Sequence, residues 1–176
     1  MSHFGLEFGS EQISILIDND TLHIKDLANS SNLASLKVKC SSSFIDHMQL
    51  SGSGDIFCPK LVNSTINISL NGSGDIVVSE MYVDRSVITL KGCGDISIRS
   101  GHCKHSDVTL KGSGDIKLLS IDSKEAKVLL EGSGDISIRV TEELFALLKG
   151  SGDIVVHGKP SINEHIVKGT GEISFI

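Results

Sequence analysis

The sequence lacks tryptophan, has only two prolines and contains 4% aromatic residues among 176. Its formal net charge is −6, and no basic segment is interleaved with aromatics, so the signature of a nucleic-acid-binding protein is missing. No run of eighteen apolar residues is present, which argues against a membrane-spanning helix. The scarcity of proline leaves extended segments uninterrupted, because proline cannot donate to a strand's hydrogen-bond ladder.

Two further absences concern location and redox state. The first twelve residues lack the basic and apolar segments of a secretory signal. The cysteines match no common zinc or haem spacing, so we expect reduced thiols and, for the sequence as given, a cytoplasmic location. The cysteines are Cys40, Cys58, Cys93 and Cys103, of which Cys40 and Cys58 are expected to face inward.

What the chain does contain is a repeat built on the motif Gly-x-Gly-Asp-Ile. Four steps of twenty residues are followed by steps of eighteen and nineteen, and the last copy has Glu in place of Asp. Internal repeats of this length indicate stacked, solenoid-like folds. The seven copies begin at Gly52, Gly72, Gly92, Gly112, Gly132, Gly150 and Gly169.

Apolar residues recur at fixed positions on both sides of each motif. Leu90 and Ile88 precede the copy at Gly92, and Ile96 and Ile98 follow it, with other residues between them. This alternation is typical of strands with one buried face, and identical units favour stacking like on like rather than a hairpin meander. We therefore predict an all-β fold: a single-stranded, right-handed parallel β-helix of about seven coils over residues 36–176. Residues 1–35 are expected to cap it, with strands over Ile13–Ile17 and Leu22–Lys25.

The closing segment from Gly150 to Ile173 resembles the ending of GIN-domain proteins, the head domains of auto-transporter adhesins. Repeated Gly-Ser-Gly-Asp-Ile turns and the late Gly158-Lys159-Pro160 before Gly169 carry the resemblance, which covers roughly residues 13–176. It implies a β-helix, a role in adhesion, and a place in the cell envelope or outside the cell. It supplies no catalytic residues.

The acidic residue of each motif would form a ladder at one corner of the stack. Neighbouring carboxylates at this spacing repel by roughly 1 kcal/mol in a water-like dielectric, so something must offset the repulsion. We expect backbone N–H groups of the same or the next turn to do so, helped by lysines one residue before the corner, namely Lys91, Lys111, Lys149 and Lys168. The alternative is calcium, although one carboxylate per coil is few for a site that needs six to eight oxygens. The ladder comprises Asp55, Asp75, Asp95, Asp115, Asp135, Asp153 and Glu172.

Two other kinds of site have less support in the sequence. A polysaccharide-cleaving β-helix would need paired carboxylates in a cleft or basic residues near a metal, and a uniform ladder offers no special pair, so we expect no enzyme. The segment Gly101–His105 contains two histidines and a cysteine, but nothing is spaced to complete a metal site, and a solvated loop is expected there.

The outward positions become apolar toward the C-terminal coils. Three residues before the motif, Thr89 and Thr109 give way to Leu129, Leu147 and Ile166, and Phe145 also falls in an outward register. An exposed apolar face suggests a contact surface. A shifted register in the shorter sixth coil is the alternative, because it would bury some of these residues. The sequence thus predicts a non-enzymatic, adhesin-like module that contacts a protein or glycan surface or a second copy of itself.

Overall fold

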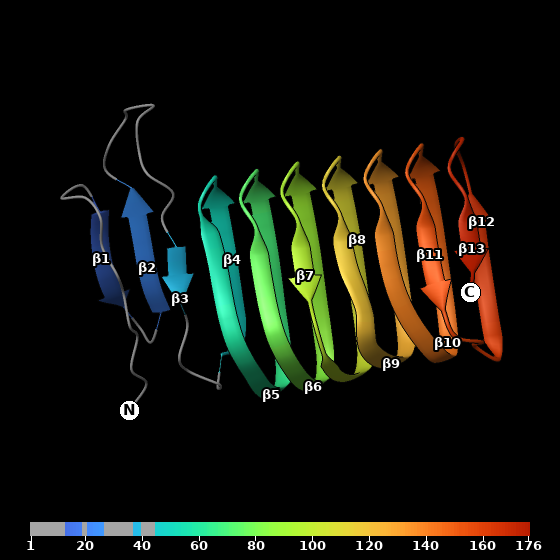
Figure 1. Cartoon of the computed structure of the whole chain (residues 1–176), viewed down its shortest axis with the longest axis horizontal. Helices are drawn as coiled ribbons and strands as arrows, with labels where there is room; N and C mark the ends of the chain where they lie inside the picture. The colour runs from blue at the N-terminus through green and yellow to red at the C-terminus, as the bar shows by residue number, and fades with distance from the viewer. Residues whose placement is uncertain (1–12, 19–20, 27–36, 40–44) are drawn as a thin grey trace.

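The computed structural model describes residues 13–18, 21–26, 37–39 and 45–176, and all regular structure in these residues is β (Figure 1). From residue 45 onward the strands follow one another with short connections, and the described residues contain no helix. They are β1 (Ile13–Asp18), β2 (Thr21–Asp26), β3 (Lys37–Lys39), β4 (His47–Gly52), β5 (Asp55–Gly72), β6 (Ile76–Gly92), β7 (Ile96–Ile98), β8 (Gly101–Gly112), β9 (Ile116–Gly132), β10 (Ile136–Gly150), β11 (Ile154–His157), β12 (Ile162–Val167) and β13 (Ile173–Phe175).

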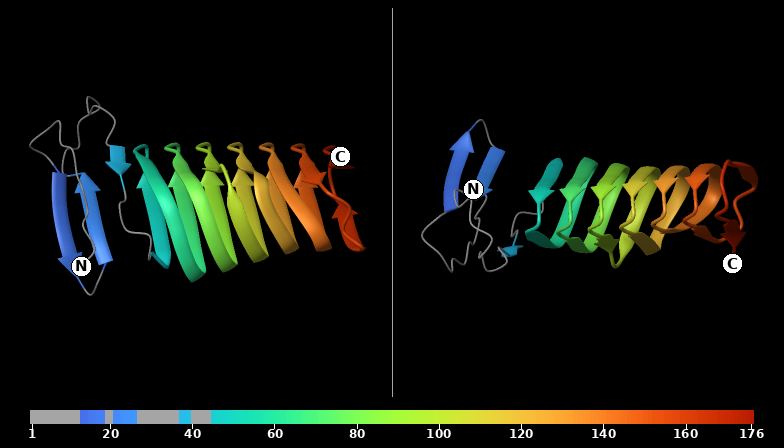
Figure 2. Two further views of the ribbon diagram at one scale, coloured as in Figure 1. Left: turned by 60° about the horizontal axis from the view of Figure 1, so that its bottom comes forward. Right: turned by 90° about the horizontal axis from the view of Figure 1, so that it is seen from above.

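The strands from β3 onward stack in parallel as a β-solenoid, which confirms the predicted parallel β-helix (Figures 1 and 2). The repeat sets the register, since each residue pairs with its equivalent in the next coil. Leu90 pairs with Leu110 and Gly92 with Gly112. β10 pairs with β9 in the same way on both sides of a bend, with register shifts in residues 138–143 that account for its two missing residues. The seven motif corners enclose six complete turns, close to the predicted seven coils.

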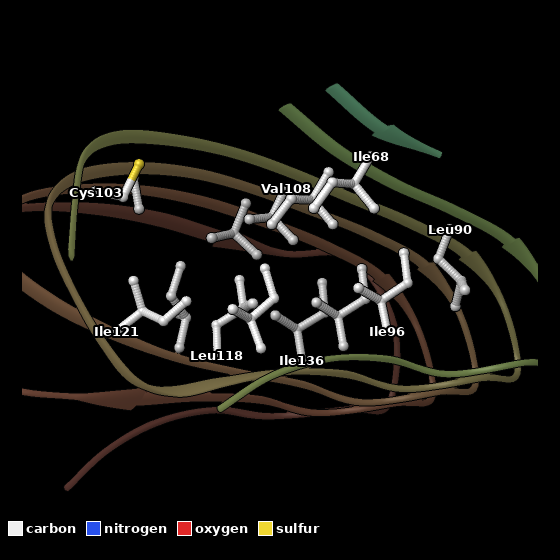
Figure 3. Close-up of a cluster of buried hydrophobic side chains, with 14 of the residues drawn as sticks. Ile68, Leu90, Ile96, Cys103, Val108, Leu118, Ile121 and Ile136 are labelled. Carbon is white, nitrogen blue, oxygen red and sulfur yellow. The ribbon is translucent and has the colours of Figure 1, made fainter. Parts of the chain in front are cut away.

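The core lies inside the flattened coil and is filled by columns of identical or similar side chains (Figure 3). In one coil the inward residues are Ile76 and Val78, then Met81 and Val83, then Ser86, Ile88 and Leu90, all of them buried. Inward positions usually follow one another in steps of two residues. The step is three from Val78 to Met81 and from Val83 to Ser86, and the chain bends there. Each fully buried Ile or Leu contributes about 1.5–3 kcal/mol relative to an exposed one, so the columns supply most of the stabilisation.

The N-terminal part also forms strands where they were predicted. β1 and β2 pair antiparallel in a sheet of their own, beside the N-terminal end of the stack (Figure 1). β3 pairs in parallel with the start of β5, so that Val38 aligns with Ile56. Capping by residues 1–35 stays a prediction, and Cys40 lies outside the described residues.

Candidate interaction surface

The glycine corners are held by backbone contacts between coils, and these contacts leave no room for side chains. The carbonyl oxygen of Gly92 accepts hydrogen bonds from the N–H groups of Ser113 at 2.9 Å and Gly114 at 3.3 Å. Gly112 has a φ of +147°, a region that other residues rarely adopt. A Cβ on Gly112 would overlap the Gly92 carbonyl oxygen, and one on Gly114 would overlap that of Gly94. From Gly72 onward, the motif glycines are therefore required by the stacking itself.

The acidic ladder is tied into the same corner. Oδ1 of Asp95 accepts a hydrogen bond from the backbone N–H of Asp115 at 2.9 Å, and Asp115 does the same for Asp135 at 3.0 Å. The pattern runs from Asp55 to the end of the stack, where Asp153 accepts from the N–H of Glu172 at 2.8 Å. Each carboxylate thus binds a donor of the next coil, which is the arrangement that a supporting role requires.

The lysines that accompany the ladder differ from those expected. Lys111 and Lys149 both pair with Glu131, at 2.8 and 3.0 Å, instead of with the aspartates. Hydrogen bonds from Lys111 and then Lys149 lower the pKa of Glu131. The expectation for these two lysines was wrong because Glu131 stands between them in their own column, one coil from each.

Among the side chains that the structure describes, Lys117 is the cation that contacts the ladder. Its ammonium group lies 3.2 Å from carboxylate oxygens of both Asp95 and Asp115. The hydrogen bond to Asp95, assisted by Asp115, raises the pKa of Lys117. Lys117 follows Asp115 by two residues, so its side chain rises on the same outward side of the corner. Alternation after the motif was the signal that could have identified it.

The stabilities of two Asp115 variants distinguish a ladder that accepts backbone hydrogen bonds from a ladder that binds calcium. Asp115→Ala removes the acceptor for the Asp135 N–H, and we expect it to lower the free energy of unfolding by about 1–2 kcal/mol. Asp115→Asn keeps an acceptor oxygen and relieves repulsion along the ladder, so we expect stability within about 0.5 kcal/mol of wild type. Urea titrations in chelator and in millimolar calcium measure both. A calcium-dependent midpoint that is lost in Asp115→Asn would instead indicate an ion-binding ladder.

The histidine-containing segment is a strand, not the expected loop. Gly101–Gly112 forms β8, in which Cys103 is fully buried and His105 faces outward. His105 Nδ1 lies 2.9 Å from a Glu125 carboxylate oxygen, and Lys104 pairs with Asp84 at 2.7 Å. Lys104 and His105 both lie on the outer side between the inward residues Cys103 and Ser106, so neither of these two side chains points toward the buried thiol. Within the described residues, no three His, Cys, Asp or Glu side chains are grouped so as to hold a metal ion.

The Cys103 thiol instead belongs to a buried polar cluster of the middle coils. Ser86 and Ser106 are 3.2 Å apart, Ser106 and Ser123 are 3.0 Å apart, and the Cys103 thiol lies 3.4 Å from Ser86 Oγ. These hydroxyl groups satisfy one another in the core. They occupy inward positions beside the bend opposite the glycine corner, so we assign them a structural role.

The outward face of β9, β10 and β12 carries the apolar residues predicted as a contact surface. Leu129 pairs with Leu147 and Leu147 with Ile166, so the three form one column, which we call the aliphatic column. Ile166 is 46% exposed, whereas Leu129 and Leu147 are partly exposed. Phe145 lies beside the column and is 42% exposed. The shorter sixth coil does shift register against β9, between Ile138 and Arg139 and between Val140 and Glu143. From Glu143 to Gly150 the pairing is continuous, so the shifts leave Phe145 and Leu147 on the outward face.

Charged residues stand directly above and below Phe145. Lys127 of β9 and Glu164 of β12 pair with it in register, so the three form a second column with the aromatic ring in the middle. Neither Lys127 nor Glu164 makes an ion pair with another described residue. Sequence reasoning missed both, although aligning the coils on their glycines would have placed them beside Phe145.

A shallow hollow adjoins Phe145 on the same face. Its volume is about 280 Å³, and it extends from Arg85 to Glu164 over the strands of five coils. Two ion pairs line it: Arg85 with Asp107 at 3.3 Å and His105 with Glu125 at 2.9 Å. Glu143, Leu144 and Lys127 are among the other lining residues. The face therefore has exposed apolar side chains with a polar depression beside them.

These features define the class of protein: a parallel β-solenoid with exposed apolar side chains and a shallow hollow on one wall. The chain belongs to the family described as "Putative auto-transporter adhesin, head GIN domain", whose profile matches residues 5–160. A search of curated proteins finds no match. In the described part of the chain, no helix is long and apolar enough to cross a membrane.

Solved structures share the fold. A protein of Bacteroides fragilis described as a putative adhesin superposes with a TM-score of 0.81 at 22% identity, over 94% of this chain and 77% of that one. A protein of Parabacteroides distasonis described as a putative lipid binding protein gives 0.72 at 23% identity, over 94% and 79%. A putative adhesin of Parabacteroides merdae gives 0.62 at 21% identity, over 94% and 78%. At these identities the likeness establishes the fold.

Proposed function

We propose that the chain is a non-enzymatic adhesion module that binds a macromolecular surface through the outward face of β9, β10 and β12. The observation that carries this proposal is the gathering of Phe145 and the aliphatic column on one wall of a regular stack. Candidate partners are a glycan, another protein and a second copy of the chain. Membership of an adhesin family supports both the role and a place in the cell envelope or outside the cell, whereas nothing supports the cytoplasmic expectation.

The geometry supports binding in two ways. Every strand of this face is hydrogen-bonded into the stack on the described residues, so its side chains are presented with little freedom to lose on binding. Aromatic and aliphatic residues ringed by charges also match the usual composition of interfaces, which have an apolar centre and a polar rim. The ladder carboxylates, by contrast, repeat one environment along the stack and each bind a backbone N–H, which favours a scaffold over a catalytic or calcium-binding role.

Bead attachment tests the proposal. Beads coated with the protein are applied to surfaces that carry mucin glycoprotein, an extracellular-matrix protein, the protein itself, or albumin. We expect attachment to at least one of the first three over albumin, reduced severalfold by Phe145→Ser because the aromatic anchor is lost.

Tyr82→Ser is the matched control. Tyr82 is 45% exposed, close to the value for Phe145, but it lies on another part of the coil and contacts Lys60. We expect it to attach like wild type. Attachment to none of the surfaces would contradict an adhesive role, and equal losses in the two variants would contradict the assignment of this face.

A further inference from the structure

We propose that the chain forms a two-fold dimer in which the outward faces of β9, β10 and β12 meet with the two solenoids antiparallel and β10 on the axis. This inference rests on the proposed function and names a second copy of the chain as the partner. It follows from the order of residues along the Phe145 column, which is Lys127, Phe145 and Glu164. When two such columns meet in opposite directions, the lysine of each copy faces the glutamate of the other.

The proposed two-fold axis lies between the two faces and runs parallel to strand β10. It reverses the order of the coils, so that each column of one copy faces the same column of the other copy in the opposite direction. Phe145 then meets Phe145 of the second copy, and Leu147 meets Leu147. One coil away, about 4.8 Å along the stack, Lys127 meets Glu164 of the second copy, and the same pair forms again on the other side of the axis. In the aliphatic column, Leu129 meets Ile166 of the second copy.

The column next to the glycine corner, which contains Glu131, Lys149 and Lys168, also brings opposite charges together when two copies meet in opposite directions. Glu131 of one copy would face Lys168 of the other, since these residues lie one coil to either side of Lys149. Lys149 faces its own copy at the axis, but its charge is already paired with Glu131 at 3.0 Å. Glu143 is the unpaired charge that the axis brings against itself, and it lies at the edge of the face.

A parallel arrangement of the solenoids would lose this complementarity. With the axis along the stack, each coil meets its own copy, so Lys127 faces Lys127 and Glu164 faces Glu164. Opposed like charges disfavour an interface and thereby select the alternative orientation. The unpaired state of Lys127 and Glu164 among the described residues leaves both available for the antiparallel contact.

The size of the face sets the expected affinity. Seven residues of strand and three coils span roughly 20 Å by 15 Å, or about 300 Å² per copy before side-chain relief is counted. This area is less than half of the roughly 800 Å² per partner that a stable, specific interface buries, and it is the size of a weak or transient contact. We therefore expect a weak, concentration-dependent dimer with a dissociation constant in the micromolar range or above.

Sedimentation equilibrium of the full chain at about 10 to 500 μM measures this association. We expect wild type to shift from the 18.7 kDa monomer toward twice that mass as concentration rises, and Phe145→Ser to remain monomeric. Lys127→Glu and Glu164→Lys should each weaken dimerisation by about tenfold, because two attractive contacts become repulsive. The double variant should recover to within about threefold of wild type.

Lys159→Glu is the charge-matched control, since Lys159 lies on the connection between β11 and β12 and makes no ion pair with a described residue. It should dimerise like wild type. A wild-type chain that stays monomeric throughout would overturn the proposal, as would single reversals without effect or a double variant that is not rescued. Attachment of the beads to mucin or matrix protein through Phe145 in the same chain would leave the adhesive function standing.

Discussion

Gly114→Ala is expected to lower the free energy of unfolding by about 3 kcal/mol, a large part of the roughly 5–15 kcal/mol that stabilises a typical domain. A Cβ at this position would overlap the carbonyl oxygen of Gly94, and that oxygen belongs to backbone that is fixed by the stack. Neither coil can move away, because the Gly92 carbonyl accepts the N–H groups of Ser113 and Gly114 at 2.9 and 3.3 Å. Urea titration followed by far-ultraviolet circular dichroism measures the loss.

Alanine substitutions at two further glycines distinguish the stability cost of steric overlap from the cost of an unfavourable backbone conformation. Gly112 combines a φ of +147° with an overlap, so Gly112→Ala should cost more than Gly114→Ala, roughly 4 kcal/mol. Gly52 has a φ of +115° but no described atom within 4 Å of the place that a Cβ would occupy, so Gly52→Ala should cost only about 1–2 kcal/mol. Ser113→Ala, between the two glycines on an exposed position, should be neutral. Equal effects at Gly52 and Gly114 would show that stacking is not what excludes the side chain.

The stack was predictable because every coil repeats the same physical solution. Seven aligned copies of one corner fix the spacing, and the alternation of Ile88, Leu90 and Ile96 fixes which side is buried. Where a coil departs from the consensus, prediction failed. The polar composition of Gly101–His105 suggested a loop, although Cys103 faces inward and Gly101, with a φ of +139°, passes closely over Met81. One buried thiol is too weak a signal of a strand on its own.

The candidate surface was predictable in its apolar part only. Leu129, Phe145 and Leu147 stand out because they replace polar residues of earlier coils at the same positions. The charges around them depend on which side chains of adjacent coils meet, and this requires the register. The same reason explains why Glu131 was missed as the partner of Lys111: the two are twenty residues apart in sequence but adjacent in the stack.

Leu148→Ala and Leu147→Ala are expected to differ sharply, although they change neighbouring residues in the same way. Leu148 is fully buried between its equivalents Leu130 and Val167, and its truncation leaves a cavity that should cost about 3 kcal/mol of unfolding free energy. Leu147 lies on the outward face and is only partly covered, so its truncation should cost less than about 1 kcal/mol when measured on dilute, monomeric protein.

Concentration makes the same pair of variants informative about function. If the outward face binds a second copy, wild type gains stability as concentration rises, because association stabilises the folded state by mass action. Leu147→Ala should lose this gain, whereas Leu148→Ala should retain it on a lower baseline. Thermal unfolding at about 5 and 500 μM separates the two effects. A Leu147→Ala variant as unstable as Leu148→Ala at low concentration would place Leu147 in the core and remove the aliphatic column from the recognition surface.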